Sequence, residues 1–437
     1  MEWWLFAIII FIVFFSLLLA NVPIAFAFGV TNLAAFLIYS RGDISILRVL
    51  SSTAYESVSS FTYSAVPLFT LMGTVLYYSG LVEGLYVSLG ELLGRIPGRL
   101  AVIATAAGAV FGAASGSSMA SVATIGSSLG PEMVKRGYAK WLAFGSIAAS
   151  GGLAVLIPPS NLMIIFGGAA GLPIGKLLIG GIVPGIILAC LMAFFIVIAS
   201  VLNPKIAPSY DVVTATGLQR FRAVLGFVPV LVIVVSVLGS IFVGLATPTE
   251  AAAVGAFMAF VLAAIYRRLT FVVCRKALLD TLNVTCMVFL IVMASMAFSQ
   301  ILALSGIADG LTRTVVGLDI TPLSTMILMN IVVLILGSLM DPVSIILIVI
   351  PVFLPIAEAL QFDLIWWALI MMVNIELGLI TPPFGLNLFV AKSVAPAGTE
   401  LVQIYRGIWP FVVLVLMTIS IMIMFPAAVL WLPNAMG

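Results

Sequence analysis

The sequence has no histidine and few charged side chains: of 437 residues, 8% are Asp, Glu, Lys or Arg. Without His, a Ser-His-Asp triad, a His-metal site and a His proton relay are all excluded. The three cysteines, Cys190, Cys274 and Cys286, have neither paired nor metal-ligand spacing, so no disulfide framework or zinc site is indicated. An enzyme would be restricted to Ser-Lys or paired-Asp chemistry, and we expect the chain not to be one.

The sequence also lacks a strong charge imbalance and a nucleotide-binding loop. The net charge is +2, with no acidic or basic tail, which gives no reason to expect nucleic acid as a partner. No Walker-type Gly-rich loop is present, so ATP cannot act on this chain directly.

Apolar residues are what the chain has in abundance. They make up 63% of the sequence, and the mean hydropathy is +1.33, far above the usage of soluble domains. Transmembrane helices tolerate the 38 Gly and 22 Pro, because neighbouring helices satisfy the freed backbone groups. We therefore predict an all-α polytopic membrane protein. The start, Met1-Glu2-Trp3-Trp4, lacks the basic region and cleavage site of a signal peptide and is expected to begin a retained span.

Two kinds of apolar segment alternate along the chain. Ordinary spanning helices are predicted near 3–20, 22–39, 62–79, 177–200, 222–244, 249–266, 281–304 and 408–432. Four further stretches are interrupted by Gly, Ser, Pro or Asn, near 100–130, 141–170, 320–357 and 364–394. The sequence Thr247-Pro248-Thr249-Glu250 is typical of a helix start.

An internal repeat relates the two halves at an offset of about 225 residues. Its landmarks are Pro23 with Pro248, Ser79–Leu85 with Ser305–Leu311, Gly116-Ser117 with Gly337-Ser338, Pro158-Pro159 with Pro382-Pro383, and Pro184 with Pro410. We predict a first repeat over 1–202 with a re-entrant hairpin near 100–130, a cytoplasmic linker over 203–222, and a second repeat over 223–437 with a hairpin near 320–357.

If Gly112–Ser121 and Leu336–Val343 are the tips of re-entrant hairpins, each half crosses the membrane an odd number of times, and the two repeats are predicted to be inverted. The distribution of Lys and Arg then predicts the orientation. With the N-terminus outside, fourteen basic residues are cytoplasmic and four are external, which favours this topology over its mirror. The cytoplasmic set is Arg95, Arg99, Lys135, Arg136, Lys140, Lys205, Arg220, Arg222, Arg267, Arg268, Arg275, Lys276, Lys392 and Arg406. The external set is Arg41, Arg48, Lys176 and Arg313.

The first candidate site is the run Ser115–Ser121 in the first predicted hairpin. Non-helical backbone at membrane depth persists only where it is buried in protein or lines a cavity, and there its oxygens can serve as ligands. The alternative is a face of small residues that lets helices pack closely.

The second candidate site is the pair of double-proline breaks, Ile157–Asn161 and Ile380–Asn387. Consecutive prolines free backbone carbonyls, which suit a sodium ion, and they expose a helix N-terminus, which suits a carboxylate. The alternative is a kink that only shapes the bundle. Because the breaks are equivalent in the two halves, we favour a midplane binding site.

The third candidate is Asp341, a carboxylate in the second hairpin. A charged side chain within the membrane has a high free-energy cost, so we expect Asp341 to contact a cation, a substrate or a hydrogen-bond network. The alternative is that Asp341 caps the helix that begins at Pro342. For Asn374 and Glu376, structural hydrogen bonds are the favoured role.

A channel would require a continuous polar lining or rings of charge. Here the polar groups gather at the hairpins and breaks, which favours a transporter.

Several motifs together resemble the large membrane subunit of tripartite ATP-independent periplasmic (TRAP) transporters. They are Ser115–Ser118 with Ala123–Gly126, Leu156–Ser160, Ala246–Ala251 and Leu379–Gly385. The resemblance covers essentially the whole chain. It implies an elevator-type secondary transporter of the ion-transporter superfamily in a bacterial or archaeal inner membrane.

The same resemblance implies how such a subunit works and what it works with. It implies import of a small organic acid by sodium symport, with Na⁺ as the coupling ion and no organic cofactor. The expected partners are a small four-helix membrane subunit, a periplasmic substrate-binding protein and the lipid bilayer. The resulting sodium-binding candidates are Ser117, Ser118, Pro158, Asn161, Gly337, Thr381 and Pro382. The substrate-binding candidates are Ser115, Ser160, Asp341, Gly385 and Asn387.

Overall fold

The computed structural model describes residues 2–40, 44–81, 83–208, 217–318 and 320–436. Within these ranges every regular element is a helix, as the sequence predicts. The first-half helices are α1 (Trp3–Leu19), α2 (Ile24–Ser40), α3 (Ile44–Ser59), η1 (Phe61–Ser64), α4 (Ala65–Tyr78), α5 (Glu83–Leu93), α6 (Arg99–Ser115), α7 (Ser118–Lys135), α8 (Lys140–Ser150), α9 (Leu153–Leu156), α10 (Asn161–Ala170), α11 (Ile174–Gly180) and α12 (Ile182–Leu202). The second-half helices are α13 (Gly217–Phe242), α14 (Pro248–Ile265), α15 (Phe271–Leu304), α16 (Ile307–Gly317), α17 (Pro322–Gly337), α18 (Pro342–Ala359), α19 (Leu364–Leu379), α20 (Leu386–Ser393), α21 (Leu401–Met424) and α22 (Pro426–Asn434).

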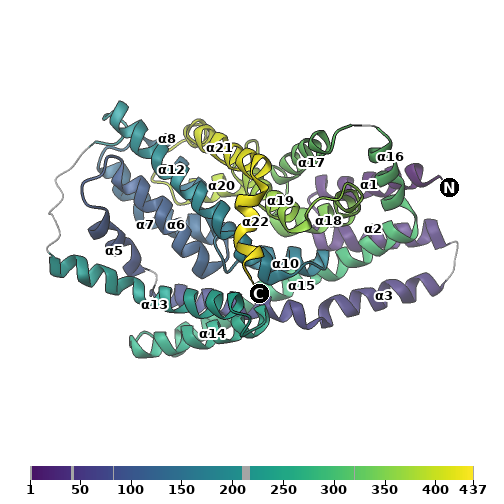
Figure 1. The fold of residues 1–437 in the computed structure, drawn as a ribbon, viewed down its shortest axis with the longest axis horizontal. Coiled ribbons are helices and arrows are strands. Elements are labelled where there is room, and N and C mark those ends of the chain that lie inside the picture. Colours follow the sequence, from purple (N-terminus) through teal and green to yellow (C-terminus); the bar gives the residue numbers. More distant parts are fainter. Residues whose placement is uncertain (1, 41–43, 82, 209–216, 319, 437) are drawn as a thin grey trace.

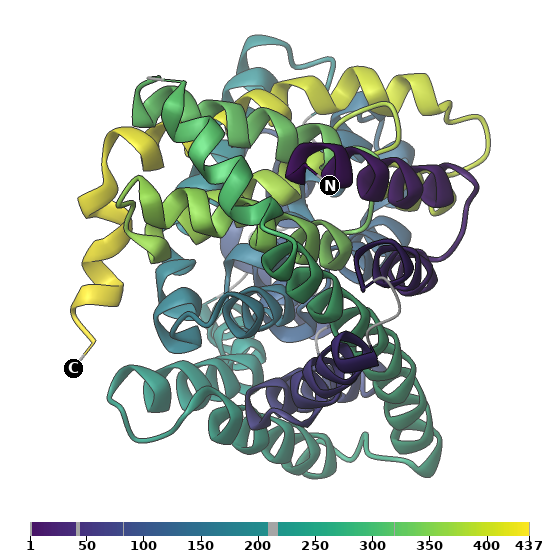
Figure 2. The same cartoon turned by 90° about the vertical axis from the view of Figure 1, so that its right-hand side faces the viewer.

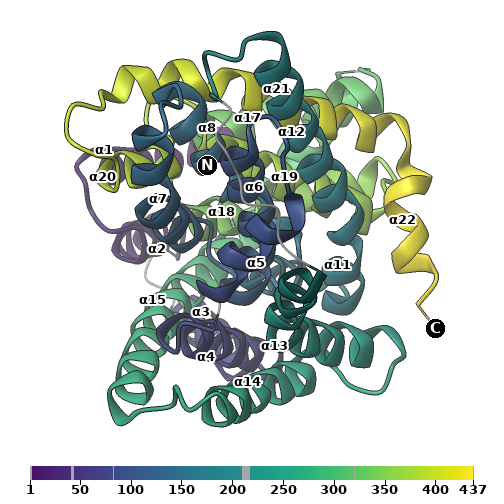
Figure 3. The ribbon, with the colours of Figure 1, turned by 90° about the vertical axis from the view of Figure 1, so that its left-hand side faces the viewer.

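The helices form two layers that face each other. The long-helix layer comprises α2, α3, α4, α13, α14 and α15, in which α4 packs against α14 and α15. The hairpin layer comprises α6–α10 and α17–α21, with α21 packed across α8 and α17 against α19. Figure 1 shows α3, α13 and α14 along the lower edge and α8, α17 and α21 along the upper edge. The end-on view in Figure 3 separates the two layers again, and Figure 2 places the C-terminus at the edge of the molecule.

Several helices are long and apolar enough to cross a membrane. In the described part of the chain there are six, and eight if each of two bent helix pairs is counted as one span. Large apolar side chains on the surface include Leu19 at 89%, Leu202 at 80% and Leu245 at 81% exposure. Such side chains suit contact with lipid, because apolar surface that faces lipid is not exposed to water.

Two pairs of consecutive helices occupy the predicted hairpin segments, and their re-entrant placement in the membrane stays a prediction. In the first, α6 ends at Ser115 and α7 begins at Ser118, and Gly116 turns the chain with φ of +62°. In the second, α17 ends at Gly337 and α18 begins at Pro342. The predicted helix start at Thr247 is also present, as a capping box with Glu250.

Both double-proline segments interrupt a helix. The first separates α9 from α10, with a bend of 46° between Lys140–Leu156 and Asn161–Ala170. The second separates α19 from α20. The peptide bonds Pro158-Pro159 and Pro382-Pro383 are both cis.

The predicted repeat would pair the helices from α2 to α10 with those from α14 to α20, ten helices with seven among the described residues. One difference is that α15 is a single helix of 34 residues, whereas its counterpart is bent by 42° between Ile46–Ser59 and Phe61–Tyr78. The predicted span 281–304 is therefore only the second part of α15. The inversion of the halves stays a prediction.

Two predicted boundaries differ from the structure. Helix α13 already begins at Gly217, inside the predicted linker 203–222, of which 209–216 lie outside the described residues. The predicted last span, 408–432, is interrupted: α21 runs over Leu401–Met424, and Pro426 starts α22. Pro426 has no backbone N–H with which to continue the hydrogen bonds of α21, and proline is favoured at the first position of a helix. It therefore favours the start of α22.

Candidate functional site

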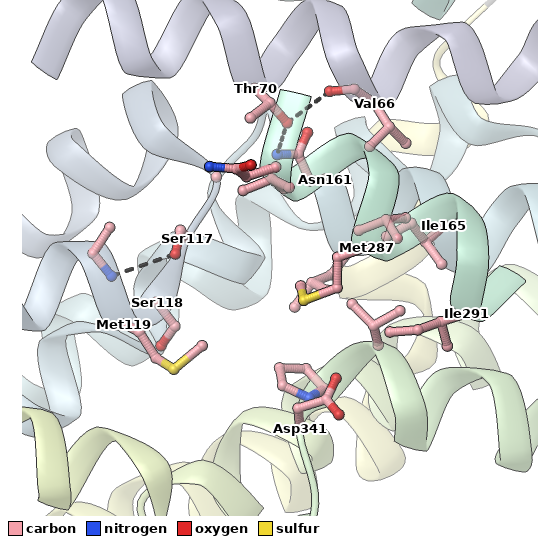
Figure 4. Close-up of a pocket in the computed structure, with 18 of the residues that line it drawn as sticks. Val66, Thr70, Ser117, Ser118, Met119, Asn161, Ile165, Met287, Ile291 and Asp341 are labelled. Carbon is pink, nitrogen blue, oxygen red and sulfur yellow. Dashed lines mark hydrogen bonds between the residues drawn. The ribbon is translucent and has the colours of Figure 1, made fainter. Parts of the chain in front are cut away.

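A cavity of about 920 Å³ lies between the two layers. The first turns of α7, α10 and α18 form one side, and α2, α4 and α15 form the other. Figure 4 shows Ser117, Ser118 and Met119 on one wall, Asn161 and Thr70 on another, and Asp341 below them. Three helix N-termini therefore border the same space, each carrying backbone N–H groups without intrahelical partners.

The first turn of α7 is fixed by its own cap. Ser117 is the N-cap residue, and its Oγ accepts a hydrogen bond from Ala120 N at 3.3 Å. Ser118 follows as the first helical residue and is 5% exposed. Both line the cavity.

The small residues of the first hairpin also have a packing role. A methyl group placed on Gly112 would lie 2.2 Å from Cα of Ala154. Helix α6 therefore approaches α9 more closely than a side chain at this position would permit.

The N-terminus of α10 reaches the cavity beside the hairpin tip. Ser160 is fully buried and caps the helix, accepting from Met163 N at 3.4 Å. Asn161 Nδ2 donates to Thr70 Oγ1 on α4 at 3.1 Å, and Asn161 Oδ1 is buried with no partner among the described residues. A methyl group on Gly116 would lie 3.4 Å from Asn161 N, so the two N-termini meet closely.

Asp341 is a helix cap that also borders the cavity, and its contact with a cation or substrate stays a prediction. It is the N-cap of α18: its Oδ1 accepts from Ser344 N at 3.1 Å and its Oδ2 accepts from the Ser344 hydroxyl. It also lines the cavity, where its carboxylate is partly exposed.

The wall formed by α15 carries a second carboxylate and several apolar side chains. Asp280 lines the cavity and accepts a hydrogen bond from the Tyr78 hydroxyl. Met287 and Ile291 lie further along the same helix (Figure 4). None of the described residues lining the cavity is Lys or Arg. Negative groups of a ligand would therefore meet helix N-termini rather than basic side chains.

Behind the first hairpin tip, Ser118 contacts two buried polar residues of the second half. Its hydroxyl donates to Glu376 Oε2 at 3.1 Å and accepts from Asn387 Nδ2 at 2.8 Å. Glu376 lies on α19 before the second break, and Asn387 lies on α20 after it. The predicted hydrogen-bonding role of Glu376 is thus seen as a contact between the halves.

The remaining predicted site residues lie away from the cavity. Gly337 packs against Gly378, and a methyl group on it would be 2.8 Å from Cα of Gly378. Thr381 Oγ1 donates to Leu377 O at 2.6 Å, and Gly385 starts α20 with φ of +47°. Pro158 is buried and Pro382 half-buried, and neither lines the cavity. The side chain of Ser115 lies outside the described residues.

Asn374, the other intramembrane polar residue considered, makes a structural contact. Its Nδ2 donates to Asn330 O at 2.6 Å, which ties α19 to α17.

Asp280, Thr70 and Asn283 are cavity residues that sequence reasoning missed. Asp280 follows the basic residues Arg275 and Lys276 in the sequence. An acid at the edge of an apolar run was the one available signal. Thr70 and Asn283 carry no such signal within their helices.

The oxygen donors present suit a hard monovalent cation better than a transition metal. No cluster of three His, Cys, Asp or Glu side chains occurs in the part of the chain that the structure describes. Hydroxyl, amide and backbone oxygens dominate, and the Oδ1 atoms of Asn161 and Asn387 are buried without partners among those residues. Neutral oxygen ligands with few carboxylates fit a sodium ion. The residues present therefore fit the ion that the resemblance implies.

The comparisons with known proteins agree with one another. Residues 11–428 match the family model of the tripartite ATP-independent periplasmic transporter, DctM component. The C4-dicarboxylate TRAP transporter large permease protein DctM of Pseudomonas aeruginosa is 36% identical over 411 residues, covering 94% of each chain. The isethionate TRAP transporter permease protein DctMQ of Oleidesulfovibrio alaskensis is 34% identical, over 94% of this chain and 64% of that protein.

A solved structure shows the same fold at much lower identity. The YdaH transporter of Alcanivorax borkumensis superposes with a TM-score of 0.64 at 15% identity, covering 87% of this chain and 89% of that one. The family match extends over nearly the whole sequence. Two of the motifs that carried the resemblance contribute residues to the cavity lining, namely Gly116, Ser117, Ser118 and Leu379. The chain belongs to the DctM-component family of tripartite ATP-independent periplasmic transporters and is a transporter subunit, not an enzyme.

Proposed function

We propose that this chain imports a small organic acid, a carboxylate or a related anion, by sodium symport. The observation that carries the proposal is the cavity between the layers, bordered by the N-termini of α7, α10 and α18. Unpaired N–H groups and the helix dipole favour an anionic group at such ends. The Asp341 and Asp280 carboxylates would face hydroxyl or amine groups elsewhere on the substrate.

Sodium would be held by oxygens at the hairpin tips and helix breaks. Ser117, Ser118 and Asn161 lie together at the first tip, next to the cavity. Thr381 and Gly337 are the corresponding candidates of the second half. Moving one charge down the membrane potential releases about 2.3 kcal/mol per 100 mV, so two or more sodium ions would drive strong accumulation.

Alternating access would be of the elevator type, with the hairpin layer moving against the long-helix layer. The cavity lies at the boundary between them, where Asn161 Nδ2 donates to Thr70 Oγ1 at 3.1 Å and Ser295 Oγ donates to Leu347 O at 2.9 Å. In the predicted topology the Arg275–Lys276 end of α15 is cytoplasmic. The cavity borders α15 near this end, at Asp280, so the conformation would be inward-facing.

The chain would work as part of a complex in a bacterial or archaeal inner membrane. A periplasmic substrate-binding protein would deliver the solute, and a separate small four-helix membrane subunit would support the permease. The longer DctMQ relative, of which this chain covers 64%, is in keeping with a second membrane component outside the matched region.

Uptake of labelled organic acids into proteoliposomes would test this proposal. The vesicles would hold this chain with its small subunit, and the cognate binding protein would be outside. Accumulation that requires both an inward sodium gradient and the binding protein is expected. Equilibration without a gradient would identify a facilitator and overturn the symport mechanism.

A further inference from the structure

Glu376 is a buried carboxylate that has no cationic partner. Its side chain is 3% exposed, and its Oε2 accepts one hydrogen bond, from Ser118. Its Oε1 is buried without a hydrogen-bond partner among the described residues. The ion pair found in those residues joins Arg136 to Glu132, far along α7 from Ser118.

An isolated carboxylate in such a place carries a large free-energy cost. Removing an ionised group from water costs several kcal/mol or more unless an opposite charge is close. A single hydroxyl donor does not offset that cost. The charge of Glu376 therefore requires a bound cation or a proton.

The surroundings of Glu376 supply further oxygens. Asn387, fully buried, donates through Nδ2 to Ser118 and leaves its Oδ1 without a partner among the described residues. A methyl group placed on Gly152 would lie 3.4 Å from both Glu376 Oε2 and Ala149 O. A methyl group on Gly151 would lie 3.0 Å from both Ser118 Oγ and Ser118 O. Two adjacent glycines thus face carboxylate, hydroxyl and carbonyl oxygens.

The predicted repeat places Gly152 and Glu376 at equivalent positions of the two halves. Glu376 and Gly152 each stand six residues before the first proline of their break, Pro382 and Pro158. Gly152 of the first half has no side chain, and the carboxylate of Glu376 from the second half packs against it. The carboxylate therefore lies where the two broken helices face each other, next to the tip of the first hairpin.

We propose that Glu376 and Asn387 bind one sodium ion together with Ser118, and so complete the sodium site to which Ser118 was assigned above at the first hairpin tip. One carboxylate with neutral oxygens balances a single positive charge, whereas Ca²⁺ and Mg²⁺ sites usually gather more carboxylates or phosphates. The ion would fix the first hairpin onto α19 and α20. This inference rests on the proposed sodium symport.

The test is sodium binding by the purified complex of this chain with its small subunit. Binding of ²²Na⁺ gives the number of ions per complex, and thermal unfolding in NaCl against choline chloride gives stabilisation as a second readout. Glu376→Gln keeps size and hydrogen bonding but removes the charge. We expect it to bind one sodium ion fewer than the wild type and to lose part of the sodium-dependent rise in Tm.

Two further variants keep the test decisive if Glu376→Gln unfolds. Asn387→Ala should retain the number of sodium ions but raise the sodium concentration for half-saturation at least tenfold. Glu358→Gln is the matched control, because Glu358 is an exposed carboxylate on α18, and it should bind sodium like the wild type.

The outcomes separate this inference from the proposed function. If the wild type binds sodium and both Glu376→Gln and Asn387→Ala bind it unchanged, the Glu376 site is wrong while sodium symport stands. If the wild type binds no sodium, the symport proposal fails as well, and Glu376 holds a proton instead.

Discussion

At the scale of single residues, Asp341 combines two tasks that a substitution can separate. Its carboxylate caps α18 through Ser344 and also faces the cavity. Asn caps helix N-termini about as well as Asp does, whereas Ala does not cap them. Asp341→Asn therefore removes the charge and keeps the cap, whereas Asp341→Ala removes both.

We predict that Asp341→Asn and Asp341→Ala both abolish or severely weaken substrate uptake in proteoliposomes. Only Asp341→Ala should also lower stability, by about 1 kcal/mol for the lost cap. Uptake and thermal unfolding of the two variants, compared at equal amounts in the membrane, check this. Normal uptake by Asp341→Asn would show that the residue serves the helix and not the substrate.

At the scale of elements, the second hairpin depends on a close helix crossing. Helices α17 and α19 meet at two glycines, and a methyl group on Gly378 would lie 2.4 Å from Cα of Gly337. Backbone atoms cannot move aside as a flexible side chain can. A side chain here would push the two helices apart.

The expected effect of Gly378→Ala is a loss of stability of about 1–3 kcal/mol, as for other overpacked sites, together with impaired uptake. Gly29→Ala is the control, because a methyl group on Gly29 of α2 meets nothing within 4 Å. The melting temperatures of the two purified variants decide the matter. Equal melting temperatures would mean that α17 and α19 adjust freely.

Sequence reasoning located the hairpins and helix breaks because their signals are local. Gly116 at a positive φ, the cap Asp341 before Pro342, and the two double prolines each act on their own few residues. The contact between Ser118 and Glu376 joins residues 258 positions apart. A single sequence carries no periodic signal for such a contact, so this part of the site became visible only in the fold.

At the scale of the whole molecule, the predicted orientation of the chain in the membrane is based on the positions of its basic residues. The predicted topology puts Lys135, at the end of α7, in the cytoplasm and Arg313, on α16, outside. Both residues are exposed in the structure. Their positions therefore suit labelling from water.

We predict that single cysteines at Lys135 and Arg313 react with an impermeant maleimide from opposite sides. The background would first have Cys190, Cys274 and Cys286 replaced by alanine. Labelling in intact cells should mark Arg313→Cys only, and inside-out vesicles should mark Lys135→Cys only. Reaction of both variants from one side would refute the inverted arrangement.

The pairing of Glu376 with Gly152 has a consequence for the resting state. In a transporter of two inverted repeats, exchanging the conformations of the halves converts one access state into the other. Identical halves would make those states equal in free energy and equally populated. A carboxylate in one half alone removes that degeneracy, and any cation or proton it holds adds to the difference. This buried contact is therefore one of the differences between the halves, beside the straight α15 and its bent counterpart, that would set the resting orientation of this protein.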